Sequence, residues 1–266
     1  MKRKYDVVFG MGAACSCSQA LREAGLQLAS FPFDWVGGPG ACFKAQMMVD
    51  DFAGWFGPET FTRLEPPKFS TAAWYRDKFG FTPIHDFHAD VPFDEELPKV
   101  RAKYRRRIDR LARLLDAAQR ALVVYIESDG FETASVEDAA RVRETLAGRW
   151  PGVAFDVLLM KYREGVPFSR RIDESGDGWR LVQYDFKDRG EEEWRVDWRQ
   201  VARWMKGEYE VADYRSADEK SQWKRLSRKQ KYAEFKAANW WGYTVTKMQY
   251  KIYKHLRTRL DRKGVI

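Results

Sequence analysis

Short apolar runs alternate with segments of helical periodicity along most of the chain. The apolar runs are bounded by polar or turn-forming residues and have the length of buried strands. We expect strands at Tyr5–Phe9, Ala121–Ile126, Val153–Met160 and Trp179–Phe186. The other segments repeat their apolar residues every three or four positions, which predicts helices with one buried side. We expect helices from about Cys15 onward and at Leu97–Ala118, Ser135–Arg149 and Trp198–Trp204.

The remaining pattern is less regular. Residues Phe43–Phe56 form a second amphipathic segment after the first helix, and residues 57–95 are rich in proline and loops, with one short strand expected at Phe79–Ile84. The helix with the clearest start is the one at Ser135, because Asp138 stands three residues later, which is capping-box spacing.

Repeated alternation of strands and helices with short connections predicts the fold class. We expect an α/β fold with a mostly parallel sheet between helices, doubly wound and flavodoxin-like or hydrolase-like. Ligand sites in such folds lie at the carboxyl ends of the strands. Cys15 follows the first of these ends, so it stands where a site is expected.

The net charge of +8 divides the 266 residues into two parts. Residues 216–266 contain fourteen Lys or Arg and four Asp or Glu, a local charge of +10, so residues 1–215 carry about −2. We therefore expect an α/β domain with a Cys–His site at 1–215 and a basic, aromatic helical extension at 216–266.

The basic extension predicts an anionic partner. Its lysines and arginines are interleaved with aromatic residues, a mixture that suits an anionic membrane surface or an acidic polysaccharide. We do not expect nucleic acid, because nothing in residues 1–215 resembles a nucleic-acid-reading module. A helix that packs on the domain accounts for the same segment equally well, since its apolar residues share one face: Val245, Met248, Ile252, Leu256 and Leu260.

Cysteine content and hydropathy indicate the compartment. The chain contains three cysteines and shows neither a signal peptide nor a run of about 18 apolar residues. Three cysteines do not form a disulfide framework, which agrees with a reducing environment. We expect a cytoplasmic protein that the basic extension can hold at the inner membrane.

The candidate chemistry begins at Gly10-Met11-Gly12-Ala13-Ala14-Cys15, a glycine turn between the first strand and the first helix. The unpaired N–H groups and dipole of a helix N-terminus stabilise a thiolate, so Cys15 is a candidate nucleophile. The alternative is that Cys15 is a small buried residue that only fills space at the strand–helix junction. The turn lacks the third glycine of a dinucleotide motif, and we expect no cofactor.

Histidine supplies the base for a thiol nucleophile. The chain has His85, His88 and His255, and we take His255 as a surface residue because it lies among basic residues of the extension. Cys–His catalysis then draws on His85 or His88. Zinc held by Cys15, Cys17, His85 and His88 is a rival interpretation, but a single residue between the cysteines strains the chelate. We expect no metal.

Three segments carry a resemblance to a known family. They are Gly12-Ala13-Ala14-Cys15 with Ala20-Leu21-Arg22 after it, Ser30-Phe31-Pro32-Phe33-Asp34-Trp35, and His85-Asp86-Phe87, followed more loosely by Arg105–Arg110. Over roughly residues 5–160 the chain resembles a bacterial family of proposed papain-like cysteine peptidases, whose members are often linked to surface-polysaccharide gene neighbourhoods. The resemblance implies Cys15 as nucleophile and His85 as base.

An acidic residue is needed to orient the imidazole. Asp86 is poorly placed in an extended segment because it points away from His85, so we choose Asp34, whose alternative role is to cap the turn before Gly37. Glu127 and Asp129 follow a strand and can line the site or cap a loop.

A nucleophile on a strand–turn–helix junction is also similar to the elbow of α/β-hydrolases and of flavodoxin-like esterases and sugar acetyltransferases. We therefore expect thiol-dependent acyl hydrolysis or transfer on a peptide or glycan in cell-surface polysaccharide metabolism. The alternative is a non-catalytic protein that binds glycan or membrane, with Cys15 buried.

Overall fold

The computed structural model describes residues 2–57, 60–65, 72–128, 133–186, 197–215 and 220–221. Two compact units divide the chain. The first comprises residues 1–27 and 31–212, and the second comprises residues 28–30 and 213–266. The basic extension predicted at 216–266 lies outside the described residues apart from Lys220 and Ser221.

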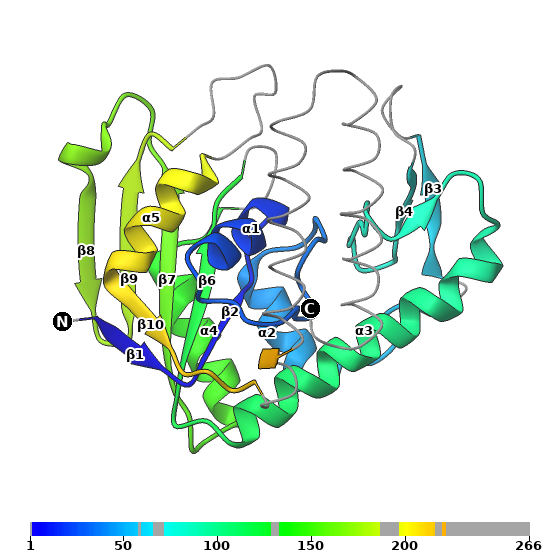
Figure 1. Cartoon of the computed structure of the whole chain (residues 1–266), viewed down its shortest axis with the longest axis horizontal. Coiled ribbons are helices and arrows are strands. Elements are labelled where there is room, and N and C mark those ends of the chain that lie inside the picture. The colour runs from blue at the N-terminus through cyan, green and yellow to red at the C-terminus, as the bar shows by residue number, and fades with distance from the viewer. Residues whose placement is uncertain are drawn as a thin grey trace. The chain divides into compact units, whose positions relative to one another are not determined.

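A five-stranded sheet forms the centre of the first unit (Figure 1). Four strands are parallel neighbours and a fifth pairs antiparallel at one edge. In spatial order they are β2 (Val7–Gly10), β6 (Arg120–Ile126), β7 (Ala154–Tyr162), β9 (Trp179–Tyr184) and β8 (Ile172–Gly176). The apolar runs predicted as strands therefore pair with one another, and the mostly parallel sheet between helices is confirmed.

Helices cover both faces of this sheet. On one face, α1 (Cys15–Glu23) lies beside α5 (Trp198–Glu208), and both pack on alternate residues of the strands, such as Val124. On the other face, α2 (Ala41–Val49) lies beside α4 (Val136–Arg149). Figure 1 shows the two layers in front of and behind the strands. Because β2 and β6 are buried on both faces, their sequences are mainly apolar rather than alternating, whereas the edge strand β8 is polar and largely exposed.

Local signals set several element boundaries. The side chain of Ser135 accepts a hydrogen bond from Asp138 N at 3.1 Å, and the carboxylate of Asp138 accepts one from Ser135 N at 2.7 Å. This capping box was predicted from the sequence and starts α4 by satisfying its first N–H groups.

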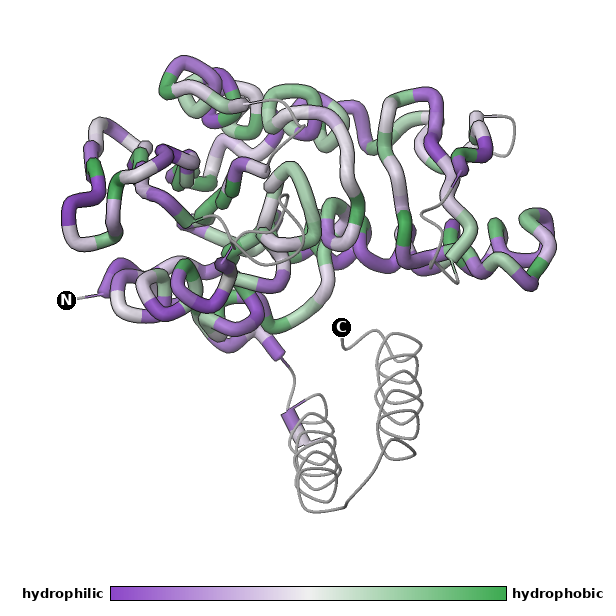
Figure 2. The backbone as a smooth tube through the Cα atoms, turned by 90° about the horizontal axis from the view of Figure 1, so that it is seen from above, coloured by the Kyte–Doolittle hydropathy of each residue, from purple (hydrophilic) through white to green (hydrophobic). Residues whose placement is uncertain are grey.

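Figure 2 shows hydrophobic stretches of the tube through the middle of the first unit and hydrophilic stretches on the surrounding helices.

The long connection between β2 and β6 contains further secondary structure besides α1 and α2. It contains a small antiparallel sheet and the helix α3 (Phe93–Asp116). The strands of this sheet are β3 (Thr62–Leu64), β4 (Ala72–Arg76) and β5 (Phe87–His88). Aromatic rings join it to α3, with centroids 4.6 Å apart for Tyr75 and Phe93.

The structure corrects two expectations in this connection. The strand predicted at Phe79–Ile84 is wrong, because only Thr82 makes a bridge, to Gly37. The amphipathic segment expected at Phe43–Phe56 is helical only as far as Val49, where α2 ends. Asp51 and Phe52 adopt positive φ angles of 49° and 56°, a backbone conformation that ends an α-helix.

Short pairing at the start of the chain was not expected. Strand β1 (Arg3–Tyr5) pairs in parallel with β10 (Tyr209–Val211), which follows α5 directly. A one-turn 3-10 helix at Phe168–Arg170 precedes β8. Among the described residues, none of the helices has both the length and the apolar character needed to cross a bilayer.

Candidate active site

The turn that leads from β2 to α1 is tied to the neighbouring strand. Met11 N donates to Val124 O at 2.8 Å and Ala13 N donates to Ile126 O at 3.3 Å, so the turn extends the parallel pairing to the carboxyl end of β6. Ala14 is the N-cap, with extended backbone, and α1 begins at Cys15. Cys15 is half-buried. The structure thus places this thiol at a helix N-terminus on the carboxyl edge of the sheet, as the sequence predicted.

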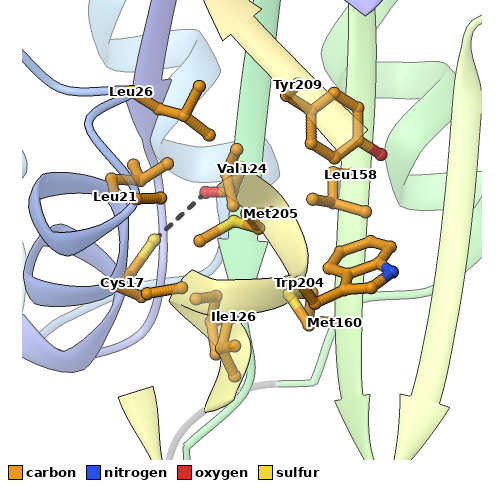
Figure 3. Packing of buried hydrophobic residues seen from close by; sticks show 14 of the residues in the cluster. Cys17, Leu21, Leu26, Val124, Ile126, Leu158, Met160, Trp204, Met205 and Tyr209 are labelled. Atoms are coloured by element: carbon orange, nitrogen blue, oxygen red, sulfur yellow. Dashed lines mark hydrogen bonds between the residues drawn. The ribbon is translucent and has the colours of Figure 1, made fainter. Parts of the chain in front are cut away.

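Cys17 occupies the opposite side of the same helix. Its side chain is buried among the residues between α1, α5 and the sheet, and its Sγ donates to Val124 O at 3.5 Å (Figure 3). Burial raises the pKa of the Cys17 thiol to about 12. This thiol is therefore protonated at neutral pH and acts as a packing group.

Cys17 also explains why the turn contains glycine. A Cβ on Gly12 would lie 2.3 Å from Cys17 Cβ, and a Cβ on Gly10 would lie 3.1 Å from Cys17 Sγ. No side chain fits at Gly12 without a shift of the helix. The glycines serve the close packing of α1 on the turn.

Cys42 lies in the first turn of α2 and is half-buried. Its Sγ donates to Asp138 Oδ1 at 3.4 Å, which links α2 to the capping box of α4. The guanidinium of Arg141 and the backbone N–H of Ser135 also bond the carboxylate of Asp138. Cys42 therefore belongs to a helix–helix contact.

Asp34 is fully buried, and both of its carboxylate oxygens accept hydrogen bonds. Oδ1 accepts from Ser18 Oγ at 2.9 Å, and Oδ2 accepts from Phe31 N at 2.7 Å and from Gln27 Nε2. Burial raises the pKa of Asp34, while the positive charges of Arg22 and Arg107 act in the opposite direction. Asp34 thus ties the segment 31–35 to the second turn of α1.

Trp35 carries the contact to His85. The two rings pack edge to face with centroids 5.8 Å apart, and the guanidinium of Arg22 lies 5.0 Å from the centroid of the Trp35 ring. Trp35 has a φ of 68°, in the left-handed region that few non-glycine residues adopt. Such backbone conformations recur at functional sites, where the surrounding structure holds them in place.

One face of α1 points at this segment. Cys15, Ser18 and Arg22 are spaced by three and four residues, which places them along the same side of the helix. Ser18 bonds Asp34 and Arg22 packs on Trp35. The Cys15 side of α1 and the exposed imidazole of His85 therefore approach the same segment, residues 31–35.

The other predicted candidates make different contacts. His88 Nδ1 lies 2.5 Å from Glu96 Oε1, and His88 N donates to Glu96 Oε2 at 2.6 Å. Asp86 is buried and accepts from Tyr104 OH at 2.6 Å and from Lys103. Burial would raise the pKa of Asp86, but Lys103 and Arg107 outweigh it and lower that pKa. Asp86 therefore faces α3.

Glu127 follows β6 and caps a neighbouring strand end, since its Oε2 accepts from Tyr162 N at 2.8 Å. Asp129 lies outside the described residues. Within the described ranges, no three His, Cys, Asp or Glu side chains are arranged to hold a metal ion. Cys17 and His88, two members of the zinc set considered above, are engaged with Val124 and Glu96.

Lys44 is the site residue that sequence reasoning missed. It projects from α2 beneath the turn and is fully buried, with Nζ 3.2 Å from Met11 O and 2.7 Å from Gly12 O. Its signal in the sequence is a lysine on the apolar face of a helix, between Ala41 and Met48. A buried lysine at such a position needs polar partners, and here it finds backbone carbonyls.

The chain was compared with known proteins. No curated protein and no solved structure matches it. A family profile matches residues 6–165, which include the glycine turn, Cys15, Asp34 and His85 and exclude the basic extension. The profile carries the description "Putative papain-like cysteine peptidase (DUF1796)". The chain belongs to this family.

Proposed function

We propose that the protein is a thiol-dependent acyl hydrolase or acyltransferase in which Cys15 is the nucleophile and His85 the general base. The observation that carries the proposal is the place of Cys15, half-buried at the first position of α1 on the carboxyl edge of the sheet. A helix N-terminus favours the thiolate, whereas Cys17 is buried and Cys42 bonds Asp138. Membership of a family described as cysteine peptidases agrees with this chemistry.

The reaction follows from these roles. His85 takes the proton of Cys15, and the thiolate attacks the acyl carbon, so that a C–S bond forms and the carbonyl oxygen becomes an oxyanion near the helix start. Collapse breaks the bond to the leaving nitrogen or oxygen, which receives the proton from His85. Water then cleaves the thioester in hydrolysis, or an acceptor hydroxyl does so in transfer, with His85 removing its proton.

In this proposal Asp34 and Trp35 are positioning residues. Asp34 bonds Ser18 Oγ, Gln27 Nε2 and Phe31 N, and so holds the segment whose next residue, Trp35, packs on His85. The ring of Trp35 then orients the imidazole of His85 through an edge contact, and Asp34 holds Trp35 in place by fixing the segment before it. This role differs from that of the Asp in a Ser–His–Asp triad, which bonds the imidazole directly.

We further propose that the substrate is an acyl group on a cell-surface glycan or peptide. The support is the similarity of this strand–turn–helix junction to the nucleophile elbow of acyl-transferring α/β folds, together with the surface-polysaccharide neighbourhoods of the resembling family. The extension at 216–266, with its charge of +10, would hold the protein on an anionic membrane or acidic polysaccharide near that substrate.

The thiol roles are tested by alkylation of the native protein with iodoacetamide over a range of pH, with each cysteine followed by peptide mass spectrometry. We expect Cys15 to react with a midpoint below about pH 7.5 and Cys42 to react with a higher midpoint, because its thiol donates to the carboxylate of Asp138. Equal rates for Cys15 and Cys42 would refute the proposal and favour the non-catalytic binding protein.

The same assay tests the base and its support. His85→Ala should move the Cys15 midpoint towards about 8.5, while His88→Ala, the matched control, should leave it unchanged because His88 bonds Glu96. Asp34→Ala should act like His85→Ala, and Asp34→Asn, which still accepts from Phe31 N, should restore most of the wild-type midpoint. A shift with His88→Ala and none with His85→Ala would reassign the base.

A further inference from the structure

Lys44 places a positive charge beneath the turn that carries Cys15. Its side chain is fully buried, its Nζ lies 2.7 Å from Gly12 O and 3.2 Å from Met11 O, and the ring centroid of Phe33 lies 5.8 Å from the same atom. Met11 and Gly12 are three and two residues before the N-cap Ala14. The ammonium group therefore contacts the backbone just before α1 begins.

These contacts fix the orientation of two peptide groups. In a trans peptide the N–H points away from the C=O of the preceding residue, so carbonyls of Met11 and Gly12 that face Lys44 turn the N–H groups of Gly12 and Ala13 to the other side. Ala13 N does donate on that side, to Ile126 O at 3.3 Å. Gly12 N lies close to Cys17, where its N–H stabilises the sulfur. The carbonyls of the turn therefore bond α2, while its N–H groups face β6 and α1.

The positive charge of Lys44 affects the pKa of a thiol near the start of α1. At Cys17, two residues beyond Cys15, the positive charge of Lys44 favours the thiolate and the negative charge of Asp34 opposes it. Arg22, on the Cys15 face of α1, adds a second positive charge that acts on Asp34. A buried charge is screened less than an exposed one, so the Lys44 ammonium contributes at Cys17, although the opposing charge of Asp34 has the larger effect there.

Burial of a lysine is costly for stability, because the ammonium loses its hydration. An apolar side chain of similar volume at this position of α2 would avoid that cost. Lys44 contacts two carbonyls of the turn and the ring of Phe33 in the segment 31–35. We therefore infer that the charge of Lys44 has a role at the turn, where its ammonium group bonds two carbonyls.

We propose that Lys44 is a positioning residue of the Cys15 site, which fixes the peptide groups of the turn and supplies the positive charge that, with the helix N-terminus, keeps the Cys15 sulfur as thiolate. This proposal rests on the proposed role of Cys15 as nucleophile. It assigns to α2 a part in the site, although α2 packs against α4 on the opposite face of the sheet from α1.

The test compares three variants in the iodoacetamide assay. Lys44→Met removes the charge at similar volume, Lys44→Arg keeps it, and Lys99→Met removes an exposed lysine of α3 as the matched control. We expect Lys44→Met to raise the Cys15 midpoint by about one pH unit, Lys44→Arg to restore it in part, and Lys99→Met to change nothing. Cys42 in the same samples should keep its midpoint in all three.

Two results would separate this proposal from the one it rests on. A low Cys15 midpoint that stays low in folded Lys44→Met overturns the role of Lys44 alone. An ordinary midpoint in the wild-type protein overturns the role of Cys15 as activated nucleophile. Near-ultraviolet circular dichroism, which reports the packing of the tryptophans, shows whether each variant is folded.

A reciprocal measurement keeps the proposal testable if Lys44→Met does not fold. In Cys15→Ser the thiolate is absent, so the pKa of the Lys44 ammonium should fall, because coupling between two sites is mutual. Nuclear magnetic resonance of 15N-lysine-labelled protein measures that pKa, with the Lys44 signal assigned as the one missing from Lys44→Arg. An unchanged Lys44 pKa in Cys15→Ser would overturn the proposal.

Discussion

At the amino-terminal edge of the central sheet, Asp156, Arg180 and Asp173 pair with other side chains across neighbouring elements. Around Cys15, at the opposite edge, Lys44 and Asp34 also bond backbone groups of nearby loops. Asp156 accepts from Tyr5 OH at 2.7 Å and from Arg120 at 3.0 Å. Arg180 bonds both carboxylate oxygens of Asp173 at 2.7 Å and Glu208 at the same distance. These networks join neighbouring strands and α5 to one another.

The Cys15 region, by which we mean residues 11–18 and 31–35, has the other arrangement. Lys44 bonds two carbonyls of the turn, Asp34 bonds the N–H of Phe31, and Glu127 nearby bonds the N–H of Tyr162. Paired side chains hold elements together, whereas side chains bonded to backbone set the shape of a loop. Substitutions at the two edges should therefore have different consequences.

The largest effect is expected at the turn itself. In Gly12→Ala the new Cβ would lie 2.3 Å from Cys17 Cβ, so α1 must shift, and we expect the free energy of unfolding to fall by about 2–3 kcal/mol. Urea unfolding followed by far-ultraviolet circular dichroism measures this change.

The matched control is Gly148→Ala in α4, where a Cβ meets nothing within 4 Å. Alanine there should raise the free energy of unfolding by about 0.5–1 kcal/mol, because glycine in a helix has the larger conformational entropy to lose. If Gly12→Ala were as stable as the wild-type protein, the close packing described for the turn would be contradicted.

The next effect is a difference in the sign of pH dependence. Burial raises the pKa of Asp34, so the folded state binds this proton more tightly than the unfolded state, and stability falls as pH rises through the raised pKa. Arg180 lowers the pKa of Asp173, so its contribution is present above the unfolded value of about 3.9 and is lost as pH falls through the folded value.

Two variants measure these opposite signs. Relative to wild type, Asp34→Asn should gain stability as pH rises above the unfolded value of about 3.9, while Asp173→Asn should lose stability as pH rises through the lowered pKa of Asp173. Urea unfolding at a series of pH values gives both curves. Curves of the same sign for the two variants would break the contrast between the two edges.

The smallest effect is expected at the amino-terminal edge. Arg120→Met removes one of the two partners of Asp156, but the Arg120 side chain is 52% exposed, so the ion pair is screened by water. We expect a loss of less than about 1 kcal/mol in the free energy of unfolding and no change in the alkylation of Cys15. Lys44→Met is the same kind of replacement at the other edge of the sheet. If Arg120→Met and Lys44→Met moved the Cys15 midpoint equally, the contrast between the two edges would be refuted.

Local signals explain which parts of the fold were predictable. The apolar run of β6 and the capping box of α4 depend on neighbouring residues, and both were placed within a residue of their positions in the structure. Strands β1 and β10 were missed, because Arg3–Tyr5 is short and charged and its pairing partner is some 200 residues away. The strand expected at Phe79–Ile84 failed because Asp77 bonds Phe79 N and Phe81 N and forms a turn.

The site divides in the same way. The turn and the helix start at Cys15 follow from glycine and helical spacing, so the position of the thiol was predictable from the sequence. The contacts of Asp34 with Ser18 and of Lys44 with Gly12 join residues 16 and 32 positions apart, and no local pattern reveals them. The edge contact of His85 with Trp35 is likewise a product of the tertiary fold.

The connection between β2 and β6 has a consequence for how the chain reaches this structure. These neighbouring strands are separated by about 110 residues, whereas β6 and β7 are separated by about 27, so closing the first pair costs on the order of 1 kcal/mol more chain entropy. The β6–α4–β7 unit can assemble from contacts close in sequence, and folding rates favour such contacts. On the ribosome, the segment with Cys15 emerges before β6, so its turn has no strand to pair with until β6 has been synthesised.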